Sequence, residues 1–290
     1  MQMGLVGLGR MGGNMRERLR AAGHEVVGFD HHPERSDAAS LAEMVDKLSA
    51  PRVVWVMVPV GVTESTIDEL AALLGSGDIV IDGGNSRFSD DPPRSTRLAE
   101  RGLGYLDVGV SGGVWGRQNG YALMVGGDEE HVQRCMPIFE ALKPAGEFGF
   151  VHAGPSGAGH YAKMVHNGIE YGLMHAYAEG YELLAASDHV TNVPGVIKSW
   201  REGTVVRSWL LDLLDRALDE DPELAGLRGY AEDTGEGRWT VEEAIRLAVP
   251  MNVIAASLFA RFASRQDDSP AMKAVAALRN QFGGHATRKR

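Results

Sequence analysis

Short apolar runs alternate with helical patterns over the first half of the chain. The runs predict strands at Met3–Val6, Glu25–Phe29, Arg52–Val58, Asp78–Asp82, Tyr105–Val110, Ala122–Val125 and Phe148–Val151. Helical periodicity lies between several of them, at Met11–Ala22, Glu64–Leu74 and Glu129–Leu142. A run of consecutive apolar residues such as VVWVMV is typical of a strand buried on both faces. The alternation predicts an α/β fold with a mostly parallel, doubly wound sheet of the Rossmann type.

The second half of the chain has helical patterns and lacks strand patterns. After the segment that begins at Gly157, the patterns cover Val205–Leu218, Val241–Leu247, Ile254–Ser264 and Met272–Gln281. Gly and Pro cluster in His152–Gly157, as expected for a boundary. We therefore predict a Rossmann domain at residues 1–155 and an all-helical domain at residues 156–290.

Composition and charge exclude several classes of protein. Of 290 residues, 44% are hydrophobic and 23% are charged, which is ordinary for a globular protein. A single cysteine, Cys135, excludes an intrachain disulfide and a Cys-rich metal site, and its amphipathic setting predicts a core position. The net charge of -10 disfavours nucleic-acid binding. Without an apolar run of about 20 residues or a signal-peptide pattern, we expect a cytoplasmic protein that does not bind membranes.

A dinucleotide-binding motif follows the first predicted strand. Gly7-Leu8-Gly9-Arg10-Met11-Gly12 has the GxGxxG spacing and opens a helical pattern. Such glycines let the backbone approach a pyrophosphate, whose charge the helix N-terminus favours. Residues 1–155 are therefore predicted to bind a dinucleotide cofactor.

The end of the second strand bears on the identity of that cofactor. Asp30 can accept hydrogen bonds from a ribose diol and would repel a 2′-phosphate, which favours NAD over NADP. His31, His32 and Arg35 could instead cradle a phosphate, so NADP is the alternative. A deazaflavin acceptor stays open as well, because a glycine-rich turn reports only a phosphate. As a competing interpretation, Asp30 is a turn residue in FDHHPE.

Four polar residues recur at helical spacing just after the predicted boundary. Lys163, His166, Asn167 and Glu170 stand at positions i, i+3, i+4 and i+7, which share one face of an α-helix. The residues between them are apolar or small, so we expect a largely buried helix with its polar stripe on a pocket. A lysine and a carboxyl in one pocket could transfer protons. The alternative is a pair of ordinary i,i+4 contacts on a solvated face.

Two glycine-rich turns follow later strands of the sheet. One is Asp82–Ser86, which contains Asn85, and the other is Asp107–Gly113, which contains Ser111, Gly112 and Gly113. Ligands of open α/β sheets bind outside the carboxyl ends of the strands. Glycines there can present backbone N–H groups to an anion. We therefore expect both turns to contact a polar ligand.

The run HYAKMVHNGIEYG resembles the signature helix of the decarboxylating 6-phosphogluconate dehydrogenases. The resemblance implies that Lys163 is the base, that Glu170 is the acid, and that His166, Asn167 and Tyr171 bind substrate. It implies oxidative decarboxylation of 6-phosphogluconate to ribulose 5-phosphate and CO2, with hydride transfer to a nicotinamide and without a metal. Asn85 and Ser111-Gly112-Gly113 match family residues that hold the sugar acid, and Val58-Pro59 matches a loop beside the cofactor.

The same resemblance extends to cations in the second half. Arg238-Trp239-Thr240 is similar to the family's KWT, with Arg in place of Lys, and Arg261 matches the family's FAR. Residues 279–285 match its RDYFGAH pattern, which in the long-chain members reaches into the neighbouring subunit's site. The resemblance therefore implies that Arg279 and His285 contribute to a substrate site, either that of their own subunit or that of a neighbouring one. These matches imply that residues 156–290 bind the sugar-acid phosphate.

Two departures indicate the short-chain branch of the family within the β-hydroxyacid dehydrogenase superfamily. Long-chain members have a duplicated helical domain, and an acidic EEG where this chain has Val114-Trp115-Gly116. A single helical copy implies that subunits interlock, so we expect a homo-oligomer, a dimer or a tetramer.

Two other functions stay open from the sequence. A short-chain β-hydroxyacid dehydrogenase of the 3-hydroxyisobutyrate type shares the GLGxMG start and a catalytic lysine, but its helix usually reads KxxNN. A non-catalytic sugar-phosphate sensor would predict loss of Lys163 or Glu170, and both are present.

Overall fold

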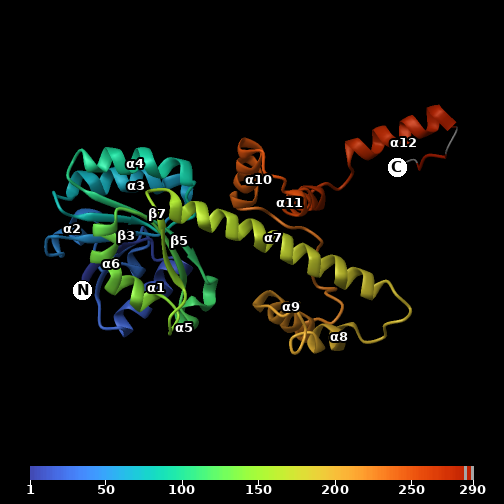
Figure 1. Ribbon diagram of the computed structural model, residues 1–290, viewed down its shortest axis with the longest axis horizontal. Helices are drawn as coiled ribbons and strands as arrows, with labels where there is room; N and C mark the ends of the chain where they lie inside the picture. The colour runs from blue at the N-terminus through green and yellow to red at the C-terminus, as the bar shows by residue number, and fades with distance from the viewer. Residues whose placement is uncertain (284–285, 289–290) are drawn as a thin grey trace. The chain divides into compact units, whose positions relative to one another are not determined.

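A seven-stranded sheet forms the first part of the computed structural model, which describes residues 1–283 and 286–288. The strand order is β2-β1-β3-β4-β5-β6-β7 (Figure 1). All neighbouring strands are parallel except β5 and β6, which are antiparallel. The strands are β1 (Gln2–Val6), β2 (Glu25–Phe29), β3 (Val53–Val56), β4 (Ile79–Asp82), β5 (Gly104–Ser111), β6 (Ala122–Gly127) and β7 (Phe150–Gly154). The predicted doubly wound sheet is confirmed.

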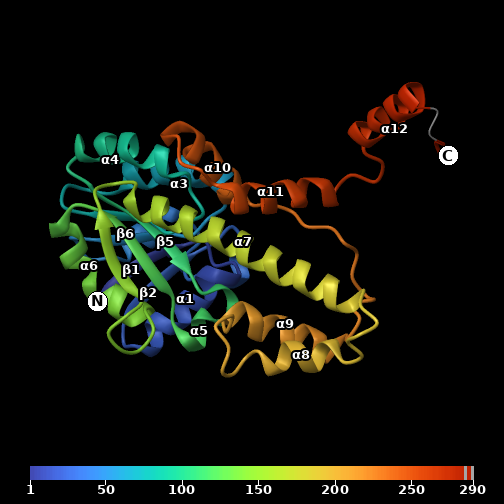
Figure 2. The same cartoon turned by 45° about the vertical axis from the view of Figure 1, so that its right-hand side comes forward.

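Helices cover both faces of this sheet (Figures 1 and 2). On one face, α1 (Arg10–Ala21) and α6 (Glu129–Leu142) pack on a core that includes Trp55 and Phe139. On the other face, α2 (Leu41–Asp46), α3 (Val60–Leu73) and α4 (Asp91–Ala99) pack on a second core around Val54 and Val80. Burial on both sides explains why the strands read as continuous apolar runs.

Cys135 lies in the first of these cores, as predicted. It is fully buried, and burial raises the pKa of its thiol to about 12. A thiol with such a pKa stays protonated at neutral pH, which agrees with a structural role.

Three short helices of this part were not predicted. They are α2, α4 and α5 (Gly116–Asn119), and short 3₁₀ turns occur at Pro33–Arg35, Phe88–Asp90 and Gly113–Trp115. Ser40 caps α2 by accepting a hydrogen bond from the Glu43 N–H, and α4 begins with Asp-Pro-Pro. Helices of four to nine residues are too short to show a clear 3.6-residue period.

From Ala158 onward the described chain forms helices joined by loops. The helices are α7 (Ala158–Ala185), α8 (Val193–Ser199), α9 (Trp209–Glu220), α10 (Glu236–Leu247), α11 (Asn252–Ser264) and α12 (Pro270–Gly283). α9 begins later than predicted because Ser208 accepts a hydrogen bond from the Leu211 N–H and caps the helix there. α10 begins five residues earlier than predicted, so Arg238 and Thr240 lie inside it.

The chain forms two compact units, Met1–His166 and Asn167–Arg290. The division falls inside α7, a continuous helix of 28 residues. The boundary between residues 155 and 156 stays a prediction.

The apolar residues of α7 are only partly buried, although we expected a largely buried helix. Met164 and Tyr171 are buried, but Ile169 and Leu173 are 52% and 43% exposed. These side chains are exposed because a single chain has only one helical domain to pack against α7. None of the helices in the described ranges is long and apolar enough to span a bilayer.

Candidate active site

The glycine-rich turn between β1 and α1 is shaped by close backbone contacts. Gly7 has a φ of +89°, and a side chain there would meet the Met57 carbonyl at 2.3 Å. A side chain on Gly12 would come within 1.9 Å of the Gly7 carbonyl oxygen. The fold itself therefore requires both of these glycines.

At Gly9, by contrast, no close contact with other described parts of the fold would exclude a side chain. No described atom lies within 4 Å of the position where its Cβ would be. Gly9 is also the N-cap of α1, with no side-chain cap, and the first turn of that helix contains no acidic residue. The open space and the helix N-terminus fit a dinucleotide pyrophosphate, which approaches the backbone closely at such a turn.

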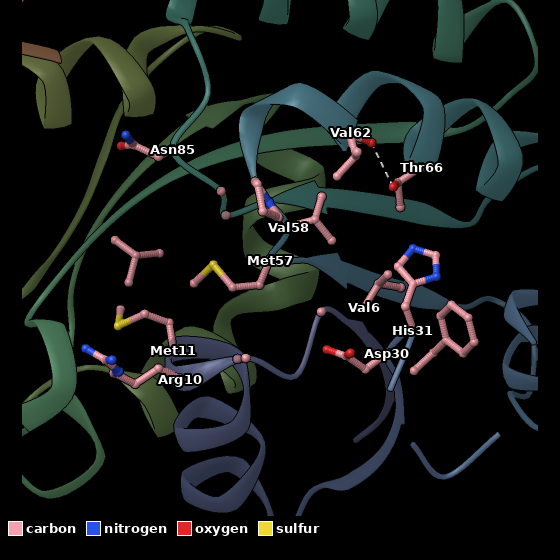
Figure 3. A pocket seen from close by; sticks show the side chains of 18 of the residues that line it. Val6, Arg10, Met11, Asp30, His31, Met57, Val58, Val62, Thr66 and Asn85 are labelled. Atoms are coloured by element: carbon pink, nitrogen blue, oxygen red, sulfur yellow. Dashed lines mark hydrogen bonds between the residues drawn. The ribbon is translucent and has the colours of Figure 1, made fainter. Parts of the chain in front are cut away.

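A cavity of about 540 Å³ lies at the carboxyl ends of the strands beside this turn (Figure 3). Ten of the predicted residues line it: Gly7, Gly9, Arg10, Met11, Gly12, Asp30, Val58, Pro59, Asn85 and Lys163. Leu8 is buried, and its backbone N–H donates a hydrogen bond to the Asp30 carboxylate. The cavity lies at the ends of the neighbouring strands β1 and β3. The strand order reverses direction between these two strands, and doubly wound sheets bind nucleotides at such a point.

Asp30 is held firmly at the end of β2. Its two carboxylate oxygens accept hydrogen bonds from the Leu8 N–H at 2.6 Å and the His32 N–H at 2.9 Å. Burial opposes ionisation, but the hydrogen bonds from His32 and Leu8 outweigh it and lower the pKa of Asp30. Asp30 is thus a fixed anion that faces the cavity.

The basic residues that follow Asp30 lie close to the carboxylate of Glu34. His32 and Arg35 each approach Glu34 Oε1 at 3.7 Å. His31 and His32 line the cavity, whereas Arg35 is not among the described residues that do. Glu34 therefore places a carboxylate beside both His32 and Arg35.

Helix α3 contributes residues that were not predicted from the sequence. Val62, Thr66 and Glu69 line the cavity, and the Thr66 hydroxyl donates to the Val62 carbonyl. The predicted helix began at Glu64, whereas α3 begins directly after its N-cap Pro59. Pro59 was thus the available signal, because proline is common next to helix starts.

Lys163 comes to the same cavity from α7, which packs directly against β5. A Cβ on Gly109 would lie 2.4 Å from the Lys163 Cβ, and one on Gly159 would lie 2.5 Å from the Asp107 carbonyl oxygen. Two glycines therefore let the helix approach the sheet closely enough for Lys163 to line the cavity.

The first predicted turn is closed by internal hydrogen bonds. Asp82 accepts from the Gly84 N–H at 3.0 Å and from the Ser86 hydroxyl at 2.7 Å. A side chain on Gly83 would collide with the Trp55 indole. This tight turn presents Asn85 to the cavity.

The second predicted turn is shorter than expected. Residues Asp107–Ser111 belong to β5, which pairs with β6 through Ser111. The turn therefore begins at Gly112, whose φ is +139°, and continues through Gly113, whose φ is +55°. Pairing with an antiparallel neighbour extends the strand beyond the point where the sequence predicted it to end.

Predicted residues of the second unit contact one another through Glu236. The Asn167 amide donates to Glu236 Oε1 at 2.7 Å, and the buried Thr240 hydroxyl donates to the Glu236 carbonyl at 2.7 Å. The Arg261 guanidinium stacks 3.5 Å from the centre of the Tyr171 ring. Glu236, which is 3% exposed, was not predicted as a site residue.

The remaining predicted residues are partly or fully exposed. Arg238 makes two hydrogen bonds to Asp233, at 2.8 and 3.0 Å. His166 and Arg279 are exposed, and Glu170 is half-buried. His285 lies outside the described residues. The roles predicted for these four residues and for Arg238 stay predictions.

A buried ionic cluster beneath the cavity was also missed. Ligand-type atoms of Asp82, Asp91 and His160 lie within 4.8 Å of one another. The Arg94 guanidinium occupies this space, 3.1 Å from Asp82 and 3.3 Å from Asp91. A charged guanidinium there makes the cluster an internal ion network and a poor site for a metal cation.

Comparison with known families covers nearly the whole chain. Residues 2–149 match the NAD binding domain of 6-phosphogluconate dehydrogenase, and residues 159–288 match the 6-phosphogluconate dehydrogenase C-terminal domain. The first match agrees with the glycine-rich turn and the cavity described above.

Individual relatives agree with these matches. The chain is 43% identical to an NAD(+)-dependent, decarboxylating 6-phosphogluconate dehydrogenase of Haloferax volcanii, over 98% of both chains. A solved Plasmodium falciparum 6-phosphogluconate dehydrogenase, studied with NADP+ and with 6-phosphogluconate, superposes with a TM-score of 0.84 at 26% identity. The present chain covers 65% of that longer protein and aligns over 98% of itself.

The alternative family shares the fold. A Mycobacterium tuberculosis 3-hydroxyisobutyrate dehydrogenase superposes with a TM-score of 0.70 over 96% of this chain and 99% of its own, at 23% identity. Both family matches and the full-length relative instead name one group of enzymes. The chain belongs to the 6-phosphogluconate dehydrogenase family.

Proposed function

We propose that this chain oxidises 6-phosphogluconate at C3 and decarboxylates it to ribulose 5-phosphate and CO2, with NAD as hydride acceptor. The observation that carries the proposal is the position of Lys163 in the wall of the cofactor cavity. An amine there lies beside the nucleotide site, where a base must take the proton of the 3-hydroxyl as hydride leaves C3.

The residues around the cavity support NAD in particular. Asp30 is a fixed anion at the end of β2, where the ribose of a dinucleotide is expected. A 2′-phosphate would be repelled by that carboxylate, and Glu34 offsets the charge of Arg35 nearby. The nicotinamide, when bound, supplies the acceptor for the hydride from C3.

Lys163 is proposed to act twice. As a neutral amine, it takes the proton of the 3-hydroxyl. As an ammonium, it then donates a hydrogen bond to the C3 oxygen, which stabilises the negative charge of the enediolate that forms as CO2 leaves. Each acid–base step of this kind contributes roughly 10²–10⁴-fold to the rate.

The other polar residues of α7 are proposed to complete the reaction. Glu170 stands seven residues after Lys163 in the same helix and delivers the proton to the carbon that becomes C1 of ribulose 5-phosphate. His166 and Asn167 hold the hydroxyls and the carbonyl of the substrate. The hydrogen bond from Asn167 to Glu236 supports an ordered amide for that role.

The two ends of the substrate need different partners. Asn85 and the turn Ser111-Gly112-Gly113 are proposed to bind the sugar-acid part. Tyr171, Arg238, Thr240, Arg261, Arg279 and His285 are proposed to bind the rest of the substrate, with the arginines on its phosphate. Arginine forks suit a phosphate because they donate two parallel hydrogen bonds.

We also propose that the active form is a homo-oligomer whose C-terminal segment contributes to the site. Large apolar side chains of the second unit are exposed in the single chain, among them Ile169, Leu183, Phe259, Met272 and Leu278. Clustered exposed apolar side chains are typical of protein–protein interfaces.

The reaction is tested with purified protein, 6-phosphogluconate and each acceptor in turn. We expect reduction of NAD with one CO2 released per NADH, and slower reduction of NADP. 3-Hydroxyisobutyrate is the matched control substrate. Oxidation of that compound without CO2 release from 6-phosphogluconate would contradict the proposal.

The acid role is tested by Glu170→Gln. We expect ribulose 5-phosphate formation to slow by about 10²-fold or more, with an unchanged dissociation constant for NAD. An unchanged rate would remove Glu170 from the mechanism.

A further inference from the structure

Three carboxylates are buried side by side under the cavity. Asp82 ends β4, Asp107 is its register partner on β5, and Asp91 begins α4. All three are fully buried. Burying carboxylates without partners is costly, so their contacts show what this cluster does.

Asp107 caps the helix that carries Lys163. Its Oδ1 accepts from the Gly157 N–H at 2.7 Å, and its Oδ2 accepts from the His160 N–H at 2.9 Å. These amides belong to the first turn of α7, which leaves N–H groups without helical partners. A strand side chain thus fixes the start of the helix one turn before Lys163.

His160 fixes the same turn through its side chain. Its Nδ1 lies 2.8 Å from Asp91 Oδ2, and both groups are buried. Asp91 Oδ1 also accepts a hydrogen bond from the Tyr105 hydroxyl at 2.7 Å. Burial disfavours the imidazolium, but the charge of Asp91 outweighs it and raises the pKa of His160 to about 9.

Arg94 joins this pair to the turn that carries Asn85. Its guanidinium lies 3.3 Å from Asp91 and 3.1 Å from Asp82, and Asp82 accepts the two hydrogen bonds that close the turn. Buried ionic contacts from Asp82 through Arg94 and Asp91 to His160 therefore connect the turn that carries Asn85 with the helix that carries Lys163. Asn85 and Lys163 both line the same cavity.

We propose that the His160–Asp91 pair is a positioning device for catalysis, which holds Lys163 in place relative to the turn that presents Asn85. The inference rests on the proposed function, because Lys163 matters only if it is the base. Neither residue of the pair lines the cavity, so their effect passes through α7 and through Arg94 to Asp82. A displacement of about 1 Å of a reacting group can cost about 10²-fold in rate.

Three variants separate positioning from folding. His160→Leu removes the contact with Asp91, and His160→Asn keeps a donor near the position of Nδ1. His152→Leu is the matched control, since His152 also lies 2.8 Å from a carboxylate, Glu129, but away from the cavity. Each variant is assayed for kcat, KM and NAD affinity, and for the deuterium isotope effect with 3-deuterated 6-phosphogluconate.

For His160→Leu we expect kcat to fall about 10²-fold, with NAD affinity unchanged and a larger isotope effect. A larger isotope effect means that the step at C3 has become rate-limiting, which a smaller folded fraction would not produce. His160→Asn should recover most of kcat, and His152→Leu should resemble the wild type. Should His160→Leu not fold, Asp91→Asn is the substitute and should show the same rise in isotope effect.

An unchanged isotope effect in the folded variant, or equal losses in His160→Leu and His160→Asn, would overturn the positioning role. A wild type that releases no CO2 from 6-phosphogluconate would instead refute the proposed function, and the inference with it.

Discussion

Two carboxylates, one lining the cavity and one buried under it, are held by backbone donors. Asp30 is fixed by two N–H groups, and Asp107 by two others at the start of α7. Backbone donors do not change with sequence, so such anions keep their place when neighbouring side chains vary.

Asp30 should set the choice of acceptor. Replacing it with Ala removes the charge that would repel a 2′-phosphate, so the ratio of kcat/KM for NAD over NADP should fall by about 10-fold or more. Steady-state kinetics with both acceptors measure this ratio. Asp46→Asn, at an exposed position in α2, is the control. A ratio that does not move in Asp30→Ala would contradict the assignment.

His160 should make stability depend on pH. Its pKa is raised from 6.5 to about 9, so the folded state binds its proton more tightly than the unfolded state does. The stabilisation is therefore complete below pH 6.5 and is lost as the pH rises through about 9. At about 1.4 kcal/mol per pKa unit, the loss is about 3 kcal/mol.

Urea unfolding between pH 6 and pH 10 measures this loss. The free energy of unfolding of the wild type should fall over that range, and His160→Asn should show a flatter profile. Parallel profiles for the two proteins would show that His160 is not charged in the folded state.

At the scale of elements, the contact of α7 with β5 decides where Lys163 lies. Gly109 and Gly159 allow this contact, and the strand and the helix meet without intervening side chains. The sequence showed the sheet and the long helices, because their periodicity is local. It did not show α2 and α4, because these helices are too short to have a clear period. It did not show the cluster around Asp91, because His160 lies 69 residues from Asp91 along the chain.

The lining of the cavity was predicted from the sequence to a similar degree. The glycine-rich turn, Asp30, Asn85 and Lys163 could be found because each follows or shares a predicted element. The part from α3 was missed since Val62, Thr66 and Glu69 carry no motif, and the expected turn at Asp107 proved to be strand. Strand pairing with β6 is a tertiary effect that local patterns do not contain.

Gly109→Ala should disturb this contact. The added methyl group would lie 2.4 Å from the Lys163 Cβ and 2.7 Å from the Gly159 carbonyl oxygen, so the helix must move. We expect the free energy of unfolding to fall by about 1–3 kcal/mol, and kcat to fall by about 10²-fold. Denaturant unfolding and steady-state kinetics measure the two effects.

Gly61→Ala is the matched control for this substitution. No described atom lies within 4 Å of the position of its Cβ, in the first turn of α3. It should raise stability by about 0.4–1 kcal/mol, because alanine restricts the unfolded chain. Equal behaviour of the two alanine variants would contradict the packing argument.

At the scale of the whole molecule, the second unit leaves much apolar surface uncovered. Met272 and Leu278 on α12 are 63% and 68% exposed. The double variant Met272→Glu, Leu278→Glu should therefore shift the protein toward monomers in sedimentation velocity, with loss of turnover. Val205→Glu, at a fully exposed loop position, should leave association unchanged. A wild type that stays monomeric at micromolar concentration would contradict the oligomer.

The central claim is that Lys163 is the base of an oxidative decarboxylation beside the nucleotide. Its most direct test compares the wild type with Lys163→Met, using 6-phosphogluconate labelled with ¹³C at C1, and follows CO2 release and NADH formation together with the NAD dissociation constant. The account predicts one CO2 per NADH for the wild type, and for the variant a turnover lower by at least about 10²-fold with NAD bound as tightly as before. Near-normal CO2 release by Lys163→Met would contradict it.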